Sequence, residues 1–132
     1  MNYNEDNLDL GESNMTMLDV KGSINNLTTT TEQHFNYIQQ QRSFTRAFPI
    51  HFELAYTDFR VIEVALQLTG EQNHALLASF AAAYEAVYQY EDAYATGGLE
   101  GFNDKFANNL NDYRQAKAKL LTIIDEINKL QP

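Results

Sequence analysis

Glu71 and His74 have the spacing of a metal-binding pair. On a helix, a Glu-x-x-His motif projects both side chains to one side, and di-iron carboxylate bundles combine two such motifs with two further glutamates. This chain offers one motif, at the expected start of a helix, where an acid also suits the first turn. We therefore predict no metal and no cofactor. Glu71 and His74 remain the candidate ligands of an alternative, a small metal-dependent helical enzyme.

Groups for covalent catalysis are missing from the sequence. No serine has the Gly-x-Ser-x-Gly context of a nucleophile elbow, and no glycine-rich phosphate loop is present. There are 0 cysteines, which excludes disulfides, thiolate metal sites and cysteine nucleophiles. We therefore predict a protein that is not an enzyme.

Tyrosines and acids gather in one stretch, at Tyr84, Tyr88, Tyr90, Glu91, Asp92 and Tyr94. On a helix, Tyr84, Tyr88 and Asp92 fall on one face because they are four residues apart, and Tyr90 and Tyr94 fall on another. Tyrosine offers contact area with a polar tip, which suits interfaces. We predict that Tyr84, Tyr88, Glu91, Asp92 and Tyr94 bind a protein partner. The alternative is a core edge whose hydroxyls reach water.

The charge balance narrows the class of partner. There are 18 acidic against 9 basic residues, a net charge of −9. Such a chain is not expected to bind nucleic acid or anionic membranes, which need clustered Lys and Arg. We expect a protein partner, possibly a basic one. The sequence shows no basic stretch followed by an apolar run, which is the pattern of a signal peptide. We therefore expect a cytoplasmic protein, and secretion by another signal remains open.

Apolar periodicity predicts an all-α, antiparallel four-helix bundle in residues 23–132, preceded by a flexible acidic arm in residues 1–22. The first helix should start near Ser23 or Thr29, where Thr29 and Glu32 have capping-box spacing, and end near Ala47. Three long helices should follow over 49–68, 71–95 and 99–130, because Pro49, Gly70 and Gly97-Gly98 mark boundaries.

The helix at 50–69 is apolar around most of its circumference, which predicts a central, buried helix. An incomplete bundle could instead cover this surface by forming a homodimer. The arm also carries apolar residues, among them Met17, Leu18 and Val20, which could dock on the bundle or on a partner.

Two short stretches resemble proteins of bacterial type VII secretion systems. Leu18-Asp19-Val20 ahead of a long helix looks like the opening of LXG-type targeting domains, and Tyr88-x-x-x-Asp92 is similar to the export signal of the helical hairpins that these systems secrete. The Trp-x-Gly turn of those hairpins is absent. The resemblance implies a cargo or targeting factor. The bundle shape also resembles bacteriocin immunity proteins, which implies an adaptor, inhibitor or immunity-type factor of bacterial or phage origin; this non-enzymatic, protein-binding role is the function we favour.

Overall fold

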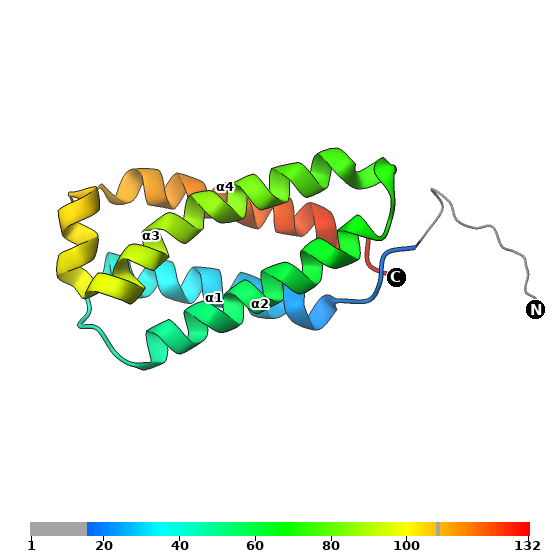
Figure 1. The fold of residues 1–132 in the computed structure, drawn as a ribbon. Coiled ribbons are helices and arrows are strands. Elements are labelled where there is room, and N and C mark those ends of the chain that lie inside the picture. The colour runs from blue at the N-terminus through cyan, green and yellow to red at the C-terminus, as the bar shows by residue number, and fades with distance from the viewer. Residues whose placement is uncertain (1–15, 108) are drawn as a thin grey trace, which may run out of the picture.

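The computed structural model describes residues 16–107 and 109–132. Its helices are α1 (Lys21–Gln39), α2 (Ala47–Gln67), the 3-10 turn η2 (Glu71–Asn73), α3 (His74–Phe106) and α4 (Leu110–Asn128). Each long helix runs antiparallel to the one before it, and α1 closes the bundle against α4 (Figure 1). The predicted all-α bundle is therefore confirmed. The part of the predicted arm in residues 1–15 lies outside the described residues.

The first helix starts close to Ser23, one of its two predicted starts, but ends earlier than predicted. It begins at Lys21, so Thr29 lies inside the helix rather than at its N-cap. It ends at Gln39 instead of Ala47, because Gln41 adopts a positive φ of 56° and the amide of Arg42 bonds back to the carbonyl of Tyr37. A residue in this left-handed region cannot continue the helix. Residues 40–46 form a connection before α2.

Gly98 separates two helical segments within α3, at the boundary that Gly97-Gly98 predicted. With φ 67° and ψ −162°, it interrupts the helical backbone. A short segment from Leu99 to Phe106 then crosses the end of the bundle (Figure 1). The chain leaves this segment at Ala107, whose φ is 48°. The predicted fourth helix of 99–130 was therefore wrong in being continuous: a helical segment does follow Gly98, but it ends at Phe106, and α4 begins at Leu110.

The core is strongly aromatic. The largest fully buried side chains include Tyr94, Tyr113, Phe80 and Phe102. In the sequence of the third helix, apolar residues spaced 4, 3, 4, 3 and 4 apart predict a seam packed against other helices: Leu76, Phe80, Ala83, Val87, Tyr90 and Tyr94. All of them are buried except Leu76, which is half-buried, so the seam is confirmed.

The prediction that helix 50–69 is the central, buried helix was wrong. α2 packs on α1 and α3 and buries a row of side chains between them: Phe48, Phe52, Ala55, Phe59, Ile62, Ala65 and Leu66. Its outer side remains exposed, because a four-membered ring of helices has no central member. Ile50 and Leu54 are 59% and 57% exposed.

The residues just before α1 lie against the bundle end. Met17 is buried, and the amide of Val20 donates to Oε1 of Gln131 over 2.7 Å. Nε2 of Gln131 donates to the carbonyl of Leu18 over 3.3 Å. Residues 16–20 are therefore tied to the C-terminus.

Candidate functional site

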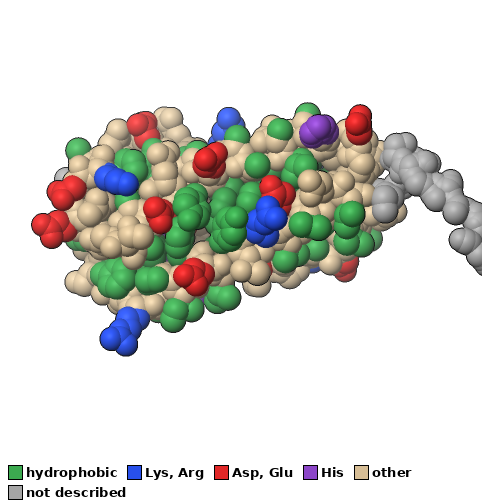
Figure 2. Space-filling view, viewed as in Figure 1, with side chains coloured by type: hydrophobic (Ala, Val, Ile, Leu, Met, Phe, Trp, Pro, Cys, Tyr) green, Lys and Arg blue, Asp and Glu red, His purple; other side chains and the backbone are tan. Residues whose placement is uncertain are grey.

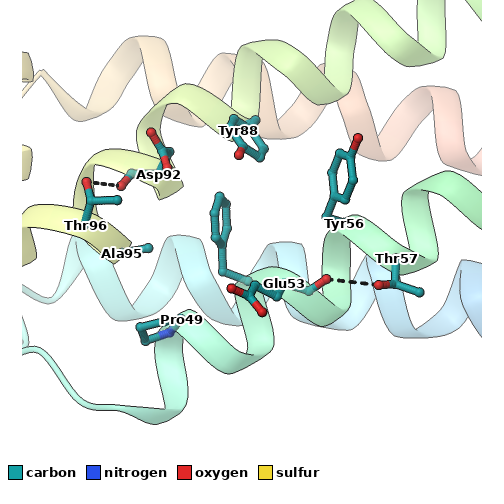
Figure 3. A pocket seen from close by; sticks show the side chains of 9 residues that line it. Pro49, Glu53, Tyr56, Thr57, Tyr88, Asp92, Ala95 and Thr96 are labelled. Carbon is teal, nitrogen blue, oxygen red and sulfur yellow. Dashed lines mark hydrogen bonds between the residues drawn. The ribbon is translucent and has the colours of Figure 1, made fainter.

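A groove of about 500 Å³ runs between α2 and α3. Its walls are Pro49, Phe52, Glu53, Tyr56 and Thr57 from α2, and Tyr88, Asp92, Ala95 and Thr96 from α3. Figure 3 shows Tyr56 and Tyr88 reaching into the space between the two helices. Apolar side chains gather along the middle of this face of the molecule, with acidic ones among them (Figure 2).

Aromatic rings from both helices contact one another along the groove, in tilted and edge-to-face arrangements. The ring centroids of Phe52 and Tyr88 are 4.9 Å apart, and those of Tyr56 and Tyr88 are 6.3 Å apart. Deeper along the same interface, Tyr84 stacks on Phe59 at 4.2 Å. The two helices are thus held apart by rigid rings, which keeps the groove open between them.

Two carboxylates border the groove, Glu53 on α2 and Asp92 on α3. Neither forms a salt bridge with any residue in the described ranges. Burial, followed by the nearby charge of Asp92, raises the pKa of Tyr88, so its hydroxyl stays protonated and can donate. No Lys, Arg or His lines the groove. The lining therefore combines negative charge with aromatic faces, a combination that favours a cation.

The structure separates the residues predicted to bind a partner. Tyr88 and Asp92 line the groove, as half-buried side chains. Tyr84 lies behind them and is 6% exposed, and Tyr94 is fully buried with its hydroxyl on the carbonyl of Arg42 at 2.7 Å. The idea that Tyr84, Glu91 and Tyr94 belong to an accessible surface therefore needs correction. Packing explains why, since the two tyrosine faces of α3 are turned toward α2 and α4.

Glu91 is in the core, at 4% exposure. Its Oε1 lies 3.1 Å from Nδ1 of His34, and its Oε2 accepts a hydrogen bond from the hydroxyl of Tyr113 over 3.2 Å. His34 stacks on Phe48 with ring centroids 4.1 Å apart. The network joins residues of all four long helices and has no access to a partner protein.

Residues of the α2 wall were missed by the sequence analysis. Phe52 and Tyr56 are an i, i+4 aromatic pair that continues the aromatic row of α3 across the interface. Glu53 was not predicted to belong to a binding site. The spacing of Phe52 and Tyr56 was visible in the sequence, but which side of their helix faces α3 was not.

Glu71 is the first residue of η2 and His74 the first residue of α3, and both are exposed. Together with Gln67, Gly70 and Leu77 they line a shallow depression. Within residues 16–107 and 109–132, no group of three or more His, Asp or Glu side chains could hold a metal ion. No helix in the described part of the chain is long and apolar enough to span a membrane.

Comparison with known proteins found no match, whether to a family model, to a curated protein or to a solved structure. The site is therefore interpreted from its own geometry.

Proposed function

We propose that this protein is a non-enzymatic helical bundle that binds a partner protein by holding one of its Lys or Arg side chains in the groove between α2 and α3. The observation that carries the proposal is the lining itself. Three aromatic rings, Phe52, Tyr56 and Tyr88, lie beside two carboxylates that have no salt-bridge partner among the described residues.

The chemistry of a basic side chain fits this lining. An ammonium or guanidinium group is attracted to the face of a tyrosine or phenylalanine ring, and more strongly so when it is partly desolvated. Glu53 and Asp92 approach from opposite walls and can accept charge-assisted hydrogen bonds. The net charge of −9 favours encounter with a basic surface. An adaptor, inhibitor or immunity-type factor would use a site of this kind.

A basic peptide provides a direct test. We expect an Arg-rich peptide to bind the full chain, with binding that weakens as salt rises, and a Glu-rich peptide of the same length not to bind. Titration followed by NMR should shift the amide signals of Tyr88 and Asp92. Asp92→Asn and Tyr88→Ala should each weaken binding about fivefold, because each removes one favourable contact of about 1 kcal/mol.

Glu85→Gln is the matched control for Asp92→Asn. Glu85 is exposed on the same helix and does not line the groove. Equal losses from Glu85→Gln and Asp92→Asn would mean that only overall charge matters, which would contradict a specific groove. Equal affinity of Tyr88→Ala and the natural chain would also contradict it.

A further inference from the structure

The outer side of α2 carries a row of exposed residues, Ile50, Leu54, Thr57, Val61, Val64 and Leu68, here called the α2 seam. Its apolar members are 40–59% exposed, although each is a large aliphatic side chain. Their spacings are 4, 3, 4, 3 and 4 residues. This alternation is the a and d pattern of a helix that packs against another helix.

The comparable apolar row of α3, Phe80, Ala83, Val87, Tyr90 and Tyr94, is buried in the bundle. α2 contacts α1 and α3 through its inner side, and no described element covers the α2 seam. The seam stands as a ridge between two grooves. The groove toward α3 is the candidate site, and a second groove of about 300 Å³ lies toward α1, lined in part by His51, Leu54 and Asp58. A ridge between two grooves is the surface that a second helix occupies.

The charges that flank the seam indicate which helix fits. In the heptad pattern, Glu53 and Arg60 lie on one flank, and His51 and Asp58 lie on the other. Within one chain Arg60 also forms a salt bridge with Glu63, and Asp58 is half-buried beside the groove toward α1, so both would have to share or exchange these contacts on pairing. In an antiparallel pair, each flank faces the same flank of its partner. A second copy then brings Glu53 opposite Arg60 of that copy, and His51 opposite Asp58 of that copy. A parallel copy would instead place Glu53 beside Asp58 of the other chain, and like charges disfavour that orientation.

We propose that the α2 seam binds a second copy of this chain, with the two α2 helices antiparallel. Ile50 contacts Val61 of the second copy, and Leu54 contacts Thr57 of the second copy. A register that overlaps the whole seam would cover Val64 and Leu68 as well. It would, however, place Arg60 opposite Arg60 of the second copy and Asp58 opposite Asp58 of the second copy. Repulsion between these like charges favours the shorter overlap, in which Ile50 contacts Val61 of the second copy.

The first test is the mass of the full chain by light scattering and analytical ultracentrifugation over a wide range of concentration. We expect a concentration-dependent dimer that Val61→Glu converts to a monomer. Ala118→Glu, on the exposed side of α4, should leave the dimer intact. Circular dichroism confirms that both variants fold. A natural chain that is monomeric at every concentration would overturn the proposal, as would a Val61→Glu dimer.

Orientation and register are tested separately. Glu53→Arg should weaken the dimer at least tenfold, and adding Arg60→Glu should restore it. Because the chain has 0 cysteines, single introduced cysteines report contacts without background. A mixture of Leu54→Cys and Thr57→Cys chains should form a mixed disulfide. Self-crosslinking of Leu54→Cys would show a parallel pair and overturn the arrangement, and self-crosslinking of Arg60→Cys would overturn the register.

The other possible occupant is this chain's own residues 1–15. If a monomeric natural chain became a dimer once these residues were removed, they would be the cover, and the proposal would fail. Glu53 and Thr57 take part in both surfaces, so the dimer and the groove are separated at two other residues: Val61 does not line the groove, and Asp92 does not belong to the seam. If Asp92→Asn lost peptide binding but still formed the dimer, the result would support the groove as the peptide site and leave the dimer proposal unchanged.

Discussion

Nδ1 of His34 lies 3.1 Å from Oε1 of Glu91 in the core, although the two residues are 57 positions apart in the chain. Both side chains are almost fully buried, and Tyr113 supplies a second hydrogen bond to the same carboxyl group. Burial, and then the charge of Glu91, raise the pKa of the Tyr113 hydroxyl well above its usual range, so it remains a donor. A polar cluster of this kind fixes how the four helices meet.

Removal of the Glu91 carboxyl group should destabilise the fold strongly. Glu91→Ala leaves the His34 imidazole and the Tyr113 hydroxyl without their acceptor in an apolar setting, which should lower the free energy of unfolding by about 3 kcal/mol. Urea denaturation at neutral pH measures the change. Glu85→Ala, an exposed site on the same helix, should stay within about 0.5 kcal/mol of the natural chain. If both variants lost the same stability, the network would have no special role.

Alkaline pH should weaken the fold through its buried tyrosines. Burial, and then the neighbouring Tyr37, raise the pKa of Tyr94 from 10.0 to about 12. Burial likewise raises the pKa values of Tyr84 and Tyr113. Between pH 10.0 and about 12, the tyrosines of the unfolded chain lose protons that Tyr94 of the folded chain keeps. The free energy of unfolding therefore falls as pH rises through this range. The stability that the protonated Tyr94 contributes is fully present only below about pH 10.

Tyr94→Phe separates the titration from the packing. At neutral pH the variant should lose about 1 kcal/mol, because the hydrogen bond to the carbonyl of Arg42 is gone. Above pH 10 its stability should decline less steeply than that of the natural chain. Urea denaturation at a series of pH values gives both slopes. Identical slopes would contradict a raised pKa at Tyr94.

The bend at Gly98 offers a pair of glycines for comparison. Gly98 has φ 67° and ψ −162°, a conformation that side-chain-bearing residues avoid, so Gly98→Ala should cost about 1–3 kcal/mol. The cost comes from the backbone, because a Cβ there would meet Phe44 only at an ordinary 3.7 Å. A Cβ added at Gly97 would meet no atom within 4 Å, so Gly97→Ala should stabilise the helix by about 0.5–1 kcal/mol. Thermal melting distinguishes them, and a harmless Gly98→Ala would be evidence against the bend.

Periodicity predicted the helices and the α3 seam because each depends on residues within a few turns. It did not predict which side of α2 is buried and which is exposed, because an apolar row has the same spacing whether it faces a core or a partner. The row at Ile50 and Leu54 was assigned to the core for that reason, and its true position depends on how helices far apart in sequence close into a ring.

The mistake at Glu91 had a signal that could have prevented it. Phe80, Tyr84, Val87, Glu91 and Tyr94 are spaced 4, 3, 4 and 3 residues apart, so Glu91 lies within an apolar row of α3. An acid in such a row needs a buried partner. His34 lies in the matching row of α1, between Thr31 and Ile38. The pairing itself still required the packing of α1 near α3, which no local pattern specifies.

The link between Gln131 and the residues before α1 leads to a last prediction. Gln131 holds the amide of Val20 and the carbonyl of Leu18 across more than 100 positions of sequence, and Met17 is buried beside this link. Gln131→Ala should therefore raise the hydrogen-exchange rate of the Val20 amide about fivefold, because the loss of a hydrogen bond of about 1 kcal/mol favours local opening. Exchange at Ile123 on α4 should not change, since that residue is buried inside the helix and before its last turn. Equal rates at Val20 in both proteins would mean that burial of Met17, and not the amide hydrogen bond, ties this segment down. Met17→Ala would then be the variant that releases it.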